Sequence, residues 1–221
     1  DYFDNDNYQA ATLELKNALL KDPDNLEARW LLARTAMAVG DGAAAEKEIG
    51  HASELGLSMQ AAQPLLIKAI FLQGDYDRVI VKTVSLVAGL PLADQAAIIS
   101  LRGQAYLEKR KFSEARQALD LALERDPKSV AGLTGMGRLY ALEGDYAEAR
   151  RWTQLALDAD ASAPEPWTQL GELDWVEGTI EAAEAAFGKA ISLTGSLTIV
   201  SAKRALVRIQ LGDFPGAAED I

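Results

Sequence analysis

The chain has 221 residues, 49% of them hydrophobic, and its 33 acidic against 22 basic side chains give a formal net charge of −11. This charge argues against nucleic acid as a main partner and against an anionic membrane surface, because both need concentrated Lys and Arg. The lack of cysteine excludes disulfides, thiol chemistry and zinc–cysteine sites. No apolar run reaches the roughly 18 residues of a membrane-spanning helix, so we expect no direct insertion of this chain into a membrane.

Taken in order, the sequence predicts pairs of short amphipathic helices and no sheet, because no alternating strand pattern occurs. The pair at 130–163 shows the pattern most clearly. Leu133, Met136 and Leu139 recur at three-residue steps and share one face of a first helix. Gly144 can take the positive φ angle that ends this helix, and Asp145 can cap the next one.

The same pattern recurs along the whole chain. An aromatic residue follows Gly-Asp or a substitute for it, and an alanine follows three places later. The alanines are Ala11, Ala45, Ala115, Ala149, Ala183 and Ala217, with Val79 in one unit. Successive members are 34 residues apart, except for the 36 residues between Val79 and Ala115. We expect the alanines and the tyrosines of this pattern to point away from water. Each helix pair has an apolar side that it cannot cover alone, so the pairs are predicted to stack.

The predicted units cover the chain from end to end as a single stacked array. They span about 1–25 (partial), 26–59, 60–95, 96–129, 130–163, 164–197 and 198–221 (partial). Because both ends fall inside a unit, we interpret the chain as a fragment of a longer array; ordinary degenerate terminal repeats are the alternative. The unit at 60–95 is two residues longer than its neighbours, and we expect its β-branched segment 79–90 to be helical.

At these residues the chain resembles the tetratricopeptide repeat, whose length is about 34 residues. The resemblance is carried by Leu170-Gly171 and by alanines late in the second helices, at Ala122, Ala156 and Ala190. Prolines between the helix pairs add to it, at Pro23, Pro91 and Pro127. It implies an all-α fold, a right-handed superhelical solenoid of helix-turn-helix hairpins. Leu57, Ala161 and Gly195 depart from the pattern at the linker proline, and Ile67 departs at the close-packing glycine.

The first three units carry a narrower resemblance. Residues 8–56 and 64–80 are similar to the amino-terminal repeats of PEP-CTERM-system tetratricopeptide lipoproteins, bacterial envelope proteins associated with exosortase-type protein sorting and exopolysaccharide production. The matching residues include Asp22-Pro23, Gly40-Asp41 and Leu65-Leu66. The resemblance implies a longer protein with a lipidated cysteine upstream, in the periplasm or at the outer membrane. This chain contains no such cysteine, so a cytoplasmic location stays open.

In stacked hairpins of this family the first helices line the concave side, which implies a peptide-binding groove. The candidate groove residues are Trp30, Arg34, Lys68, Phe71, Gln104, Arg138, Glu172 and Trp175, and Ser100 is expected to be exposed beside them. The basic residues could attract an acidic peptide and the aromatics could anchor it. The alternative is a solvated helix face whose aromatics pack against neighbouring hairpins.

The function favoured is a non-catalytic protein–protein interaction scaffold that holds a protein or peptide segment, with no cofactor and no metal. Glu46, Glu48 and Glu54 have no histidine or cysteine companions, and Trp152 and Trp167 are interpreted as packing residues. The alternative is a substrate-recognition arm of a larger enzyme such as a glycosyltransferase. That alternative predicts ladders of asparagine, but asparagine occurs only in the first unit, at Asn5, Asn7, Asn17 and Asn25. The partner and the oligomeric state are left undetermined.

Overall fold

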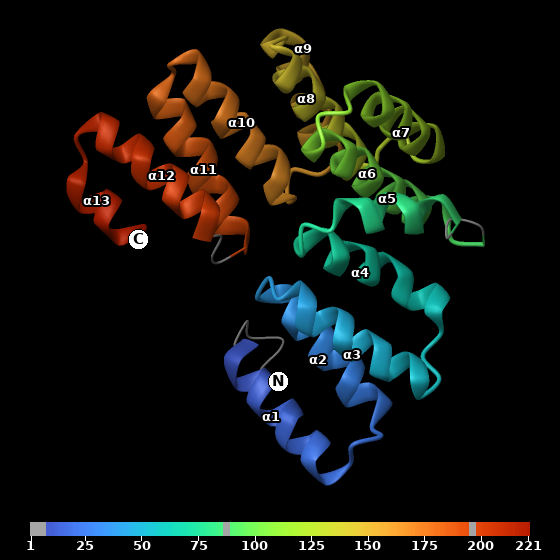
Figure 1. Cartoon of the computed structure of the whole chain (residues 1–221). Coiled ribbons are helices and arrows are strands. Elements are labelled where there is room, and N and C mark those ends of the chain that lie inside the picture. The colour runs from blue at the N-terminus through green and yellow to red at the C-terminus, as the bar shows by residue number, and fades with distance from the viewer. Residues whose placement is uncertain (1–7, 86–88, 195–197) are drawn as a thin grey trace. The chain divides into compact units, whose positions relative to one another are not determined.

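The computed structural model describes residues 8–85, 89–194 and 198–221, and this part of the chain is helical, with no strand (Figure 1). Its helices are α1 (Tyr8–Lys21), α2 (Leu26–Ala38), α3 (Gly42–Glu54), α4 (Met59–Leu72), α5 (Tyr76–Ser85), α6 (Leu92–Glu108), α7 (Phe112–Arg125), α8 (Val130–Glu143), α9 (Tyr146–Ala159), α10 (Pro164–Glu177), α11 (Ile180–Thr194), α12 (Thr198–Leu211) and α13 (Phe214–Glu219). The all-helical prediction is therefore confirmed. None of these helices is both long and apolar enough to span a bilayer.

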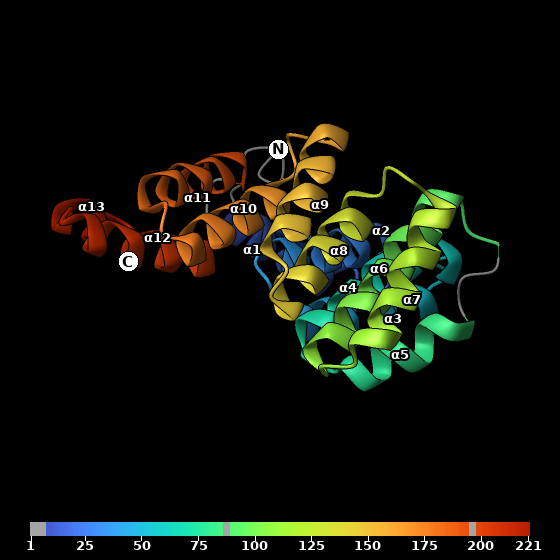
Figure 2. The same ribbon diagram turned by 90° about the horizontal axis from the view of Figure 1, so that it is seen from above.

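The chain divides into two compact units, Asp1–Ala115 and Arg116–Ile221. In the first unit α2 packs against α3, and α4 contacts α2, α3, α5 and α6. In the second unit α8 packs against α9 and α10 against α11, while α12 contacts α11 and α13 (Figure 2). The division of the chain into repeat units, and its interpretation as a fragment of a longer array, stay predictions.

The turn inside each hairpin repeats one local device. Gly144 ends α8 with φ 86°, and the Asp145 carboxylate accepts a hydrogen bond from the Glu148 N–H at 3.1 Å, which caps α9 as expected. Asp41 and Asp213 cap α3 and α13 in the same way. Arg110 is the exception: it holds φ 54° where the other hairpin turns have glycine, although this region is unfavourable for a residue with a Cβ.

The repeated alanines lie where two helices approach most closely, as expected. Ala45, Ala149 and Ala183 are fully buried, and so is Val79, their substitute in the irregular unit. A Cβ on Gly137 would lie 3.1 Å from the Ala149 carbonyl oxygen, so α8 and α9 are almost in backbone contact. Small residues are required at this crossing because no space is left for larger ones.

The aromatic residues of the same pattern are less buried than expected. Tyr146 is 38% exposed, so the expectation that it points away from water is wrong, and Phe214, the aromatic of the last unit, is 66% exposed. Each is the first residue of a second helix, beside the hairpin turn, where solvent still reaches the ring. Gly42 replaces the aromatic in α3 because a Cβ there would lie 2.4 Å from the Ala69 carbonyl oxygen of α4.

The irregular unit differs from its prediction at its end. Helix α5 is described to Ser85, and residues 86–88 lie outside the described residues. Gly89, with φ 93°, and Leu90 are not helical, so the helix expected over 79–90 is wrong at these two residues. A left-handed glycine cannot continue a right-handed helix, and the Gln95 side chain donates to the Leu90 carbonyl at 2.7 Å.

Ion pairs join successive hairpins at equivalent places in the second unit. Arg150 of α9 donates to the buried Asp174 of α10 at 2.8 Å and also pairs with Glu177. Burial acts to lower the pKa of Arg150, but the hydrogen bonds that its guanidinium donates to the two carboxylates outweigh burial and raise the pKa. Thirty-four residues further on the charges are exchanged, because Glu184 of α11 pairs with Arg208 of α12 at 2.8 Å.

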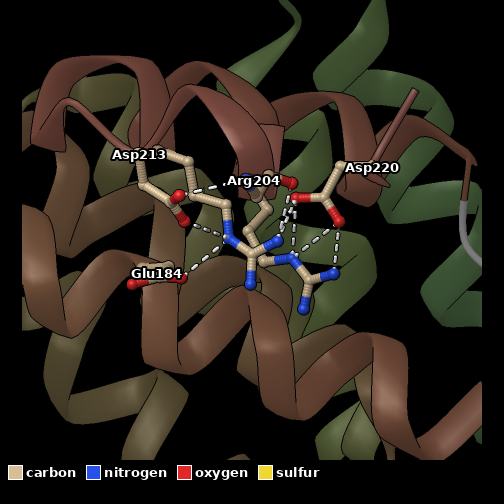
Figure 3. Close-up of polar contacts among 6 residues, drawn as sticks. Glu184, Arg204, Asp213 and Asp220 are labelled. Atoms are coloured by element: carbon tan, nitrogen blue, oxygen red, sulfur yellow. Dashed lines mark hydrogen bonds and ion pairs between the residues drawn. The ribbon is translucent and has the colours of Figure 1, made fainter. Parts of the chain in front are cut away.

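Asp220, directly after α13, connects this helix to Arg204 and Arg208 of α12 (Figure 3). Its side chain is only 2% exposed and accepts hydrogen bonds from Arg204, and from Arg208 at 3.2 Å. Arg208 also donates to the Gly216 carbonyl at 2.8 Å. A buried carboxylate that accepts from two guanidinium groups is well compensated for its lost hydration, so this cluster fixes the short α13.

Candidate peptide-binding surface

Five of the eight candidate groove residues belong to the first unit. Trp30 and Arg34 lie on α2, Lys68 and Phe71 on α4, and Gln104 on α6. Because α2 contacts α4 and α4 contacts α6, the structure brings these three first helices together. Arg34 and Lys68 are exposed, and Gln104 is half-buried. We refer to the five residues as the α2–α4–α6 face.

The aromatics of this face are only partly available to a ligand. Trp30 and Phe71 are half-buried and pack against the core cluster that contains Ile67 and Ile70. Phe71 also meets Tyr76 edge to face, with ring centroids 5.3 Å apart. Each side chain therefore contributes to the core and is not fully buried, and the peptide-binding role of this face stays a prediction.

The other three candidates lie in the second unit, Arg138 on α8 and both Glu172 and Trp175 on α10. Glu172 forms an ion pair with Lys203 of α12, and Trp175 donates its indole N–H to Gln210 at 3.1 Å. The negative charge of Glu172, which differs in sign from Arg34, Lys68 and Arg138, is therefore compensated by Lys203 of the same unit. All three residues are half-buried.

One residue expected beside the groove is placed differently. Ser100 is fully buried, and its hydroxyl donates to the Ala96 carbonyl at 2.7 Å. The expectation that it is exposed is wrong, since α6 turns this small side chain into the helix packing. Among the asparagines, Asn25 is used as the cap of α2, accepting from the Ala28 N–H at 2.9 Å, while Asn5 and Asn7 lie outside the described residues.

The acidic residues considered for metal binding each have another side chain as a partner. Glu46 pairs with Arg78 at 2.6 Å and Glu48 with Arg29 at 2.8 Å, while the Glu54 carboxylate lies 3.6 Å from His51 Nδ1. Within residues 8–85, 89–194 and 198–221, no group of three His, Cys, Asp or Glu side chains is arranged to hold a metal ion.

A cavity of about 400 Å³ lies in the second unit, and none of the candidate groove residues lines it. It is lined by Leu123, Pro127, Lys128, Leu133, Trp152, Leu155, Asp158 and Ala159. Sequence reasoning missed this feature and assigned Trp152 to packing alone. The sequence did contain a signal for this cavity. The residue 34 positions after Leu133 is Trp167, so the hairpin of α8 and α9 has a smaller side chain at this position than the hairpin of α10 and α11.

Comparison with known proteins supports the class of fold. Family models described as tetratricopeptide repeat match residues 2–56 and 100–164. The chain therefore carries tetratricopeptide repeats, as its spacing predicts, and its fold is one consistent with a protein–protein interaction scaffold. No curated protein sequence matches the chain, so the narrower resemblance to PEP-CTERM-system lipoproteins stays a prediction.

Solved structures show the same fold at low sequence identity. The chain is similar to TTC0263, a thermophilic tetratricopeptide-repeat protein of Thermus thermophilus, with a TM-score of 0.70 and 20% identity over 83% of this chain and 99% of that chain. It is also similar to a chain of the APC/C hetero-tetramer Cut9-Hcn1, with a TM-score of 0.71 and 18% identity over 90% of this chain. It spans 38% of that second chain.

Proposed function

We propose that the chain is a non-catalytic scaffold that binds an acidic segment of a partner protein on the α2–α4–α6 face. The observation that carries the proposal is that Arg34 and Lys68, one repeat apart, are both exposed on adjacent first helices. Two cations on neighbouring helices attract carboxylates in a protein that is otherwise strongly acidic.

The neighbouring side chains favour a peptide over an isolated anion. Trp30 and Phe71 are half-buried and lie one helical turn along the chain from Arg34 and Lys68 respectively, and aromatic residues provide much of the binding energy at protein interfaces. Gln104 adds an amide that can both donate to and accept from a peptide backbone. A segment with acidic residues and one or two apolar side chains fits these groups.

The resemblance of residues 8–56 and 64–80 to envelope lipoproteins supports a setting for this scaffold. We propose that it works in a bacterial protein-sorting or exopolysaccharide-associated system. Localisation of the full gene product in membrane and periplasmic fractions tests this setting separately from the binding face. Recovery in the cytoplasm alone would contradict the setting and leave the binding proposal to its own test.

Charge reversal on the binding face tests the proposal directly. The double variant Arg34→Glu with Lys68→Glu should keep the helical circular-dichroism spectrum of the wild type. It should lower the association rate of a fluorescent Asp/Glu-rich peptide by about tenfold or more, because exposed charges act mainly on encounter. Stopped-flow anisotropy at low and high salt measures the rate.

A matched control separates local attraction from net charge. Lys47 and Lys111 are exposed and lie outside the α2–α4–α6 face, so Lys47→Glu with Lys111→Glu gives the same change in net charge. This control should bind the peptide almost as fast as the wild type. Equal loss in both variants would mean that only the overall charge matters, and the proposed face would then be wrong.

A further inference from the structure

The cavity beside Trp152 lies on elements that do not contribute to the α2–α4–α6 face. Its walls come from the end of α7, the linker before α8, the first turn of α8 and one side of α9. Six of its eight lining residues are apolar, and it is partly open to solvent beside Leu155, which is 38% exposed. About 400 Å³ is within the range of small-ligand sites, roughly 300–1,000 Å³.

The chain shows what fills the equivalent place in the next hairpin. Trp167 lies 34 residues after Leu133 and packs against the core cluster around Phe187. Its indole N–H donates to the carbonyl of Ala161, six residues earlier, at 2.9 Å. A side-chain donor therefore ties the start of the first helix to the linker that precedes it.

The same contact occurs at the start of the hairpin of α2 and α3, with a different donor. Arg29 donates through Nε and Nη2 to the carbonyl of Pro23, again six residues earlier, at 3.2 and 3.1 Å. Leu133 occupies this position in the hairpin of α8 and α9 and has no donor. The corresponding acceptor, the carbonyl of Pro127, belongs to a residue that lines the cavity.

Trp152 is the second unusual wall residue. Its indole nitrogen is buried, and within the described residues it has no hydrogen-bond partner. In the next hairpin the equivalent residue is Ala186. The tryptophan therefore stands in the second helix of one hairpin, as Trp152 with Leu133 in the first helix, and in the first helix of the next, as Trp167 with Ala186 in the second helix.

We propose that this cavity binds a tryptophan side chain of a partner protein, inserted where Trp167 lies in the next hairpin. The incoming indole packs against Leu123, Leu133 and Trp152, and its N–H donates to the Pro127 carbonyl as that of Trp167 donates to Ala161. Lys128 and Asp158 line the cavity with opposite charges, which suits a neutral peptide backbone. The site is separate from the face proposed above for acidic segments.

Titration calorimetry and NMR with N-acetyl-tryptophanamide, indole and free tryptophan test this site. The wild type should bind the blocked amide at one saturable site, at least as tightly as free tryptophan, with chemical-shift changes at the Trp152 indole. Leu133→Trp supplies the missing ring from the chain itself and should weaken binding at least tenfold. Leu155→Lys, which copies Lys189 of the next hairpin, should weaken binding while the fold stays intact.

Trp167→Leu provides the reciprocal test, because it should open an equivalent cavity and raise the number of bound molecules from one to two. Circular dichroism confirms that each variant is folded. Absence of saturable binding to the wild type, or unchanged binding to both Leu133→Trp and Leu155→Lys, would overturn the site. Binding of free tryptophan but not of the blocked amide would overturn the polypeptide occupant.

Discussion

Replacing Ala149 with leucine tests the close helix packing that the repeat pattern requires. Ala149 is fully buried, and its carbonyl oxygen would lie 3.1 Å from a Cβ on the facing Gly137. Leucine adds three carbon atoms where this crossing has no space. Inserting such groups into a packed core costs about 1–3 kcal/mol, which for a chain of this length corresponds to a melting temperature lower by roughly 2–12 °C.

Thermal unfolding followed by circular dichroism measures this effect, and urea unfolding gives the free energy independently. Ala147→Leu is the matched control, because Ala147 is exposed two residues earlier on the same helix. The control should change the free energy of unfolding by less than about 0.5 kcal/mol. If Ala149→Leu melts at the same temperature as Ala147→Leu, the close packing of α8 on α9 is refuted.

Three further predictions concern single local features. Arg110→Gly should stabilise the protein by about 0.5–1 kcal/mol, because glycine adopts the left-handed backbone conformation without the strain that a Cβ causes. Gly144→Arg should destabilise the protein for the same reason. Urea midpoints that move in the same direction for both variants would contradict this reasoning. Gln169→Leu should stabilise by about 1–2 kcal/mol, since both side-chain polar atoms of Gln169 are buried without a partner among the described residues; a lower urea midpoint would contradict it. Hydrogen bonds from Ser162 lower the pKa of Asp160, so this pKa is lower in the folded than in the unfolded protein. The resulting stabilisation is fully present at a pH above the unfolded-state pKa, and it is lost as the pH falls through the folded-state pKa. Ser162→Ala should therefore raise the Asp160 pKa in an NMR titration and reduce stability more at neutral than at acidic pH, and an unchanged titration would exclude this cause.

Several departures from expectation depend on what surrounds a residue in the folded chain. Gly42 has the position of an aromatic in the pattern, and only the approach of the Ala69 carbonyl explains its identity. Ser100 has the spacing of a groove residue, yet the packing of α6 buries it. Phe214 has the spacing of a buried ring, yet it lies beside a turn and stays exposed. For Gly42 the deciding contact lies in the next hairpin, whereas Ser100 depends on the packing of α6 and Phe214 on the turn before α13.

The candidate binding face could be predicted only in part. Spacing placed Arg34 and Lys68 at equivalent positions, and both are exposed. It gave no sign that Lys203 would neutralise Glu172, or that Gln210 would accept the Trp175 indole N–H. These partners are separated by more than 30 residues in the sequence, and only the packing of α12 beside α10 brings them together.

The helix pairs, their turns and their buried alanines followed from the amino-acid sequence alone, because each depends on local spacing, capping and side-chain size that recur every 34 residues. The tertiary structure alone decided which polar residues pair between hairpins, which rings stay in water and where a cavity remains. Those outcomes depend on how one hairpin packs against the next, and a pattern within a single helix contains no information about the surface that it will meet.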